Sequence, residues 1–237
     1  MIVTMLKMGL DIVDFHSHIL PCADHGSSSL KTSLFQLDQA VRNSVKRIIA
    51  TPHFYPMDDD VKGFLERRNA AYEMLSPSLG DGMPSVKLGA EVMMCNGLEH
   101  LPDLEKLFVN GTNTLLIELP ISDFQIEYAN SALRIVEQGV DVILAHPERY
   151  SVEAVQTMLE NGVKLQCNAY TLSKRSKRKA VFPWFADGHV VALGSDIHQY
   201  DSSAYKNFAK SISCLGDYAE RIKAYTDCIW NMAQTSI

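Results

Sequence analysis

The fold of this chain follows from the stretch Asp14-Phe15-His16-Ser17-His18-Ile19-Leu20-Pro21-Cys22-Ala23-Asp24-His25-Gly26. It begins within a short apolar run, residues 12–15, which has the character of a β-strand. Side chains alternate between the two faces of a strand, so His16 and His18 are expected to point the same way. Two imidazoles on one face can chelate one metal ion, and His25 follows after a short loop. Histidines that only satisfy hydrogen bonds also explain a lone His-x-His pair, so the rest of the sequence must decide.

The chain has 237 residues, a length at which α/β barrels routinely form one domain, and we expect a single domain over residues 1–237. Its net charge of −6 argues against nucleic acid as the main partner, because that affinity depends on Lys and Arg neutralising phosphates. No apolar stretch approaches the ~20 residues needed to span a bilayer. Residues 1–10 lack the long apolar region of a signal peptide, and the five cysteines show no Cys-x-x-Cys spacing. These features predict a cytoplasmic protein without membrane insertion.

Seven short apolar segments alternate with helical segments along the chain. This alternation predicts a parallel sheet covered by helices, because strands buried on both faces carry near-continuous apolar runs. A closed barrel and a doubly wound sheet both fit. However, no Gly-x-Gly-x-x-Gly motif follows the first strand, which removes the main sign of a dinucleotide-binding sheet. The predicted strands cover residues 12–15, 46–50, 86–91, 114–119, 141–145, 163–167 and 189–193.

Histidines and carboxylates stand at the carboxyl ends of six of these seven segments. In a β/α barrel, these ends meet on the face where the active site is built. Any one of the residues could be an isolated polar residue at a strand end, but this explains six ends out of seven poorly. The residues are His16, His18, His25, His53, Glu91, Glu118, His146, Asp196 and His198. Nine mixed ligands are too many for one ion, so the sequence predicts a metal centre with more than one ion.

Six motifs, in this order, resemble those of PHP-domain phosphoesterases, the polymerase and histidinol phosphatase superfamily. The motifs are His-Ser-His-Ile-Leu-Pro at 16–21, Ala-Thr-Pro-His at 50–53, Gly-Ala-Glu at 89–91, Leu-Ile-Glu-Leu-Pro at 116–120, Ala-His-Pro-Glu-Arg-Tyr at 145–150 and Gly-Ser-Asp-Ile-His at 194–198. The chain most resembles the metal-dependent protein-tyrosine phosphatases of bacterial capsule and exopolysaccharide operons, over about residues 11–198. The resemblance implies a distorted seven-stranded (β/α)7 TIM-like barrel, the PHP fold.

The resemblance also implies three divalent metal ions, with Mn expected and Fe or Zn as alternatives. By position, one ion would bind His16, His18, Glu91 and Asp196; a second would bind Glu91, Glu118 and His146; a third would bind His25, His53 and His198. The expected catalytic residues are Glu91, His146 and Arg149, with Arg149 clamping a phosphate oxygen. The implied reaction is attack of metal-activated hydroxide on phosphotyrosine of a bacterial protein, a tyrosine kinase that regulates polysaccharide export.

Two positions depart from the pattern of this subgroup. Asp24-His25 stands where two aspartates are usual, and residues 199–203 contain no Arg, which leaves Arg149 as the clearest cation for phosphate. Two alternatives therefore stay open: a small-molecule phosphatase such as a histidinol-phosphate phosphatase, and a metal-binding regulatory module without catalysis. A cysteine-based phosphatase is excluded, because no cysteine has an Arg six residues further on.

A basic run, Lys174-Arg175-Ser176-Lys177-Arg178-Lys179, follows the sixth predicted strand and so begins on the expected active-site face. Charge runs usually form a solvated helix start or surface face. The alternative is that this run steers an acidic phosphorylated tail towards the metals. The sequence leaves both interpretations open, and it does not indicate an oligomeric state.

Overall fold

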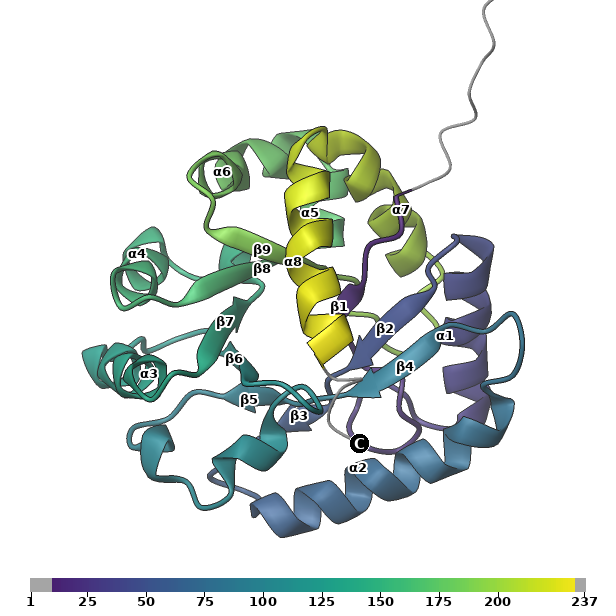
Figure 1. Cartoon of the computed structure of the whole chain (residues 1–237), viewed down its shortest axis with the longest axis horizontal. Coiled ribbons are helices and arrows are strands. Elements are labelled where there is room, and N and C mark those ends of the chain that lie inside the picture. Colours follow the sequence, from purple (N-terminus) through teal and green to yellow (C-terminus); the bar gives the residue numbers. More distant parts are fainter. Residues whose placement is uncertain (1–9, 233–237) are drawn as a thin grey trace, which may run out of the picture.

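The computed structural model describes residues 10–232, which form an α/β fold with one curled sheet (Figure 1). All paired strands run parallel, in the order β3-β5-β6-β7-β8-β9-β1-β2-β4, and this confirms the predicted parallel sheet. Most of the segment inspected for a signal peptide, residues 1–9, lies outside the described residues. The strands are β1 (Asp14–Ser17), β2 (Arg47–Ala50), β3 (His53–Phe54), β4 (Ser85–Leu88), β5 (Glu91–Met93), β6 (Thr114–Glu118), β7 (Asp141–Ala145), β8 (Lys164–Asn168) and β9 (Val190–Gly194).

The sheet has nine strands where the sequence predicted seven, because an additional short strand, β3, follows the second predicted strand and because the third predicted strand is interrupted. Thr51-Pro52 separates β2 from β3, and a proline has no N–H to donate to a neighbouring strand. Gly89-Ala90 separates β4 from β5. Hydrogen bonds continue beside both breaks: the Gly89 N–H donates to the Ala50 carbonyl (2.9 Å), and the Glu91 N–H donates to the Pro52 carbonyl (3.1 Å). As a result, β2 pairs with β4 at one end of the strand order, while β3 pairs with β5 at the other.

Helices surround the sheet on its outside, and α8 crosses its centre (Figure 1). Residues 98–107 form two short 3₁₀ turns, with Pro102 between them. Within residues 10–232, no helix is long and apolar enough to cross a membrane. The α-helices are α1 (Leu30–Arg42), α2 (Val61–Leu75), α3 (Ile126–Glu137), α4 (Val152–Glu160), α5 (Ala169–Ser173), α6 (Arg175–Ala186), α7 (Ala204–Leu215) and α8 (Tyr218–Met232); the 3₁₀ turns are η1 (Ser76–Ser78), η2 (Leu98–His100), η3 (Leu104–Leu107) and η4 (Pro147–Arg149).

The buried apolar side chains form two clusters. The larger one packs strands against the surrounding helices. The smaller one takes side chains from five strands and the segments beside them, and among the described residues α8 is the only helix that contributes to it. We therefore place this inner cluster on the concave side of the sheet, which α8 covers (Figure 1). Its members are Val13, Phe15, Ile49, Val109, Leu116, Ile143, Ala145, Ala192, Ile229 and Trp230.

Candidate metal centre

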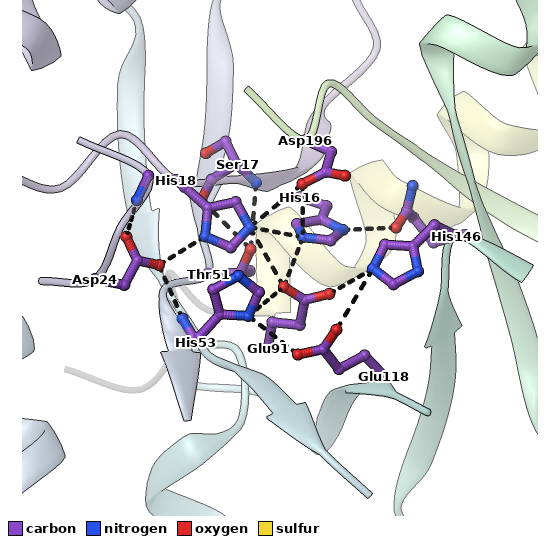
Figure 2. A network of polar contacts seen from close by, with 12 residues as sticks. His16, Ser17, His18, Asp24, Thr51, His53, Glu91, Glu118, His146 and Asp196 are labelled. Carbon is purple, nitrogen blue, oxygen red and sulfur yellow. Dashed lines mark hydrogen bonds and ion pairs between the residues drawn. The ribbon is translucent and has the colours of Figure 1, made fainter. Parts of the chain in front are cut away.

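Glu91, the first residue of β5, is at the centre of a buried cluster of histidines and carboxylates (Figure 2). Its Oε2 lies 3.1 Å from Nε2 of His16, 3.3 Å from Nε2 of His18 and 3.0 Å from Nδ1 of His53. Its Oε1 lies 2.7 Å from Nε2 of His146. One carboxylate therefore faces four imidazole nitrogens that come from three separate segments of the chain.

Two further carboxylates extend the cluster on either side of Glu91. Glu118, at the end of β6, lies 3.1 Å from Nδ1 of His53 through Oε1 and 3.8 Å from Nε2 of His146 through Oε2. Asp196, after β9, places Oδ1 3.5 Å from Nε2 of His18 and 3.4 Å from Nδ1 of His198. The carboxyl ends of the parallel strands thus meet at one edge of the curled sheet, where the sequence predicted that these side chains would converge.

Three sets of side chains have ligand atoms close enough together, within 4.8 Å, to hold a metal ion. They are His16, His18 and Glu91; His53, Glu91 and Glu118; and His18, His53 and His198. Within the described part of the chain, His25 belongs to none of these sets. It is exposed, and its ring stacks on His53 with 4.7 Å between the ring centroids.

Hydrogen bonds from outside the cluster fix how three of the imidazoles face it. Nδ1 of His16 lies 2.8 Å from Oε1 of Gln166, which can only accept, so His16 carries a proton on Nδ1 and turns its Nε2 inward. Nδ1 of His18 is held at 2.7 Å by the Asp24 carboxylate. Nδ1 of His146 lies 3.0 Å from the hydroxyl of Tyr150.

The donor set fits divalent metal ions. Imidazole nitrogen and carboxylate oxygen are the ligands that Mn, Fe and Zn accept in mixed sites. Oε2 of Glu91 is buried, and none of the three imidazole nitrogens that lie 3.0–3.3 Å from it makes a hydrogen bond of good geometry with it. A buried polar atom of this kind requires a partner, and a bound cation would supply one.

Sequence reasoning missed the outer partners of these histidines. Gln166 was not singled out, although it is a polar residue inside the otherwise apolar strand β8, and that contrast was the available signal. Asp24 was noted only for its place in the motif, yet it also accepts a hydrogen bond from the His53 backbone N–H (3.0 Å). Asn168 was noted at the end of its strand, and its amide donates to Oδ2 of Asp196 (2.8 Å).

Burial and charge act against each other on the pKa values of this cluster. Burial lowers the pKa of His53, but hydrogen bonds with Glu118 and Glu91 raise it to about 9. Burial raises the pKa of Glu91, but the charge of His16 and hydrogen bonds from the surrounding histidines hold it well below its usual range. His198 behaves differently: burial and the neighbouring charge of His18 lower its pKa to about 4. Without a metal, protons on the imidazoles therefore balance the buried carboxylates.

The backbone at the site leaves little space and is locally strained. A Cβ on Gly26 would lie only 2.0 Å from the Cβ of His18, so that position must be glycine if the loop is to close over the histidine. His146 (φ 34°) and Asp196 (φ 50°) adopt the left-handed conformation that most residues avoid. Both residues belong to the cluster, so the fold holds two of its ligating groups in conformations that cost energy.

Arg149 joins the cluster to a neighbouring cavity. Its guanidinium forms an ion pair with the Asp196 carboxylate, and its side chain is 43 % exposed. The cavity has a volume of about 660 Å³, and Arg149, Asn168 and Asp196 belong to its lining. An arginine in this position combines a buried anionic partner with free N–H groups that face solvent.

A family model described as capsular polysaccharide synthesis, CpsB/CapC, matches residues 12–217 of this chain. The chain belongs to the CpsB/CapC family. Tyrosine-protein phosphatase CpsB of Streptococcus pneumoniae is 27 % identical over 81 % of this chain and 84 % of its own length. Tyrosine-protein phosphatase YwqE of Bacillus subtilis is 30 % identical over 58 % of this chain and 55 % of its own length.

A solved structure shows that CpsB/CapC proteins share this fold. The structure is described as one of the crystal structures of YwqE from Bacillus subtilis and CpsB from Streptococcus pneumoniae, unique metal-dependent tyrosine phosphatases. It superimposes with a TM-score of 0.77 and covers 95 % of this chain and 96 % of its own, at 20 % sequence identity. The resemblance inferred from the six motifs is therefore confirmed for the family and for a curled parallel α/β sheet.

Proposed function

We propose that this protein is a metal-dependent protein-tyrosine phosphatase, which hydrolyses the phosphomonoester of phosphotyrosine. The observation that carries the proposal is the buried Glu91 carboxylate facing four imidazole nitrogens, with Arg149 paired to Asp196 of the same cluster and lining the neighbouring cavity. Its CpsB/CapC relatives, which are named tyrosine-protein phosphatases, support the same reaction.

The metal ligands we propose are the nine predicted residues His16, His18, His25, His53, Glu91, Glu118, His146, Asp196 and His198. Bound divalent ions would activate a water for attack on phosphorus and neutralise phosphate oxygens. Glu91, with one oxygen towards His16 and His18 and the other towards His146, is placed to bridge two ions. Three ions, with Mn preferred over Fe or Zn, would use all nine ligands.

Arg149 is proposed to bind the phosphoryl group. Its guanidinium already donates to Asp196, which fixes its position, and its remaining N–H groups are free to clamp a phosphate oxygen. The leaving phenolate of tyrosine has a pKa near 10, so it needs little protonation to depart. The site therefore does not require a dedicated general acid for this substrate.

We also infer several finer properties. Counting each interrupted strand pair, β2 with β3 and β4 with β5, as one unit gives seven β/α units, as in a distorted (β/α)7 PHP barrel. We propose one domain over residues 1–237, a cytoplasmic location, and a bacterial tyrosine kinase of capsule or exopolysaccharide synthesis as the phosphoprotein substrate. The family description, capsular polysaccharide synthesis, supports the last of these.

Phosphate release by Mn²⁺-reconstituted protein tests the proposal. A phosphotyrosine peptide and histidinol phosphate are compared, with His16→Ala as the inactive control, and we expect release from the peptide by the native chain alone. Release from histidinol phosphate only would replace the proposal with a small-molecule phosphatase. If neither substrate reacts although the protein binds metal, the chain is a regulatory module. Metal content and a thermal melt of His16→Ala show whether the variant is folded.

A further inference from the structure

The cavity beside the metal-ligand cluster lies between η4, α5, α6 and α7 and has a volume of about 660 Å³. At one end it is lined by Arg149, by the buried Asn168 and by Asp196, whose side chain is 4 % exposed. Elsewhere it is lined by Tyr170, which is 47 % exposed, together with Lys177 and Trp184 of α6. We call this space the α6 cavity. A phosphotyrosine bound at the cluster would have its flanking residues at this opening.

The α6 cavity has positive charge at its edge. Nζ of Lys177 and Nζ of Lys174 lie 4.7 Å and 5.2 Å from the centroid of the Tyr170 ring, so both ammonium groups are held at the cavity by the aromatic face. A separate surface hollow is lined by Lys174 and by three further cationic residues, Arg175, Lys179 and Lys210. Most of the basic run thus lines these two hollows, and Tyr170 contacts one lysine of each.

These charges are not neutralised by the protein. Among residues 10–232, the ion pairs of lysine and arginine lie elsewhere, and none includes a member of the run 174–179 or Lys210. Three carboxylates also line the cavity, and each has a partner in its own chain. Asp196 forms an ion pair with Arg149. Asp201 accepts from the N–H and hydroxyl of Ser203, both at 2.7 Å, and Glu148 accepts from the Asn168 N–H at 3.0 Å. On a protein of net charge −6, this local positive surface stands out.

A second cavity, next to His53, has the opposite character. It has a volume of about 510 Å³ and is lined by apolar and uncharged side chains together with Asp58, without a basic residue. Tyr55 belongs to this lining, and its ring stacks on His53 with 5.3 Å between centroids. The two cavities beside the cluster therefore differ in charge. Of the two, only the α6 cavity has basic residues that attract acidic side chains.

We propose that the α6 cavity binds acidic residues next to the phosphotyrosine of a peptide substrate, with Lys177 as the residue that determines this specificity. The inference rests on the proposed function. Lys177 supplies the charge that pairs with a flanking carboxylate, while Tyr170 and Trp184 supply flat surface against the peptide chain. Arg149, at the inner end of the cavity, binds the phosphate. Recognition of the flanking sequence is thus separated from the chemistry, which the metal ligands carry out.

Steady-state kinetics with two matched phosphotyrosine peptides tests this inference. The peptides differ only in flanking residues, Asp and Glu in one and Asn and Gln in the other, and a small aryl phosphate serves as third substrate. Lys177→Gln should lower kcat/KM for the acidic peptide about three- to tenfold, mainly through KM, because one favourable charge pair is lost. The neutral peptide and the aryl phosphate should change by less than about twofold, since neither meets that charge.

Two further variants make the test decisive. Lys46→Gln is the matched control. Lys46 is exposed and lies just before β2, at the opposite end of the strand from the cluster. This variant should leave kcat/KM unchanged for all three substrates. Lys177→Glu should reverse the preference and favour a peptide with flanking lysines. Equal effects of Lys177→Gln on both peptides, or a native chain that does not distinguish them, would overturn the inference while phosphatase activity stands. A native chain that hydrolyses none of the three substrates would overturn the proposed function and this inference together.

Discussion

At the scale of single residues, the ligating groups of the candidate centre depend on hydrogen bonds from the other side of each imidazole. His16 is the clearest case, because Gln166 accepts from its Nδ1 and fixes which nitrogen faces the cluster. Gln166 in turn donates through Nε2 to Oδ1 of Asn168 (3.1 Å), so its own orientation is set. Such outer partners typically tune metal affinity as strongly as a change of ligand.

Gln166→Leu should therefore weaken metal binding by about 10- to 100-fold without removing any proposed ligand. Leucine keeps the apolar packing of β8 but leaves His16 free to rotate and change tautomer. Competition titration with a chelating dye measures the affinity, and Gln166→Glu, which retains an acceptor, should restore most of it. Gln156→Leu, at an exposed position of α4, is the matched control. An unchanged affinity in Gln166→Leu would show that the hydrogen bond does not orient His16.

The ligand types could be predicted from sequence, but their outer partners could not. His53, Glu118 and His146 stand at or beside the ends of apolar segments, and the parallel topology alone brings such ends together. The bond between His16 and Gln166 joins positions 150 residues apart, and it depends on the register between strands that no local pattern contains. The position of His25 outside the three compact ligand sets likewise depends on loop geometry.

At the scale of elements, α2 begins at a side-chain cap. Asp60 is its N-cap, and its carboxylate accepts a hydrogen bond from the Gly63 N–H at 2.7 Å. The additional strand β3 and the interruption of the third predicted strand were missed. Pro52 was visible as a signal for the first, whereas Gly89-Ala90 continues an apolar run and only the pairing with β2 reveals the second.

Asp60→Ala should lower the free energy of unfolding by about 1 kcal/mol, because one N–H at the start of α2 loses its partner. Chemical denaturation measures the loss. The slope of the unfolding free energy against denaturant concentration should stay the same. Asp58→Ala, an exposed aspartate two residues earlier, should change stability much less. Equal losses in the two variants would indicate that the helix start responds to general charge and not to the cap.

At the scale of the whole molecule, metal and protons compete for the same buried cluster. In the metal-free protein His53 has a pKa of about 9, against an ordinary value of 6.5. A histidine whose pKa is raised by folding contributes stability that is complete below pH 6.5 and is lost as the pH rises towards 9. From this shift, the contribution of His53 is about 3 kcal/mol.

Chelator-treated protein should therefore become less stable between pH 6.5 and 9, while metal-loaded protein should not, because metal binding requires the deprotonated imidazoles. Denaturant unfolding at pH 6, 7.5 and 9, with EDTA or with Mn²⁺, measures both curves. In His53→Gln the metal-free decline should be smaller. A metal-free curve that is flat over this range would contradict the assignment of a protonated His53 to the empty cluster.

The inner cluster beneath α8 has a consequence for the order in which the protein can be made. Every proposed ligand lies between residues 16 and 198. The family match ends at residue 217, so the ligands and the matched region all precede α8 (218–232). Ile229 and Trp230, which pack into the concave side of the sheet, are therefore synthesised after the whole ligand set. On the ribosome, the nascent chain carries a complete set of ligands while the apolar interior of its sheet is still open to water.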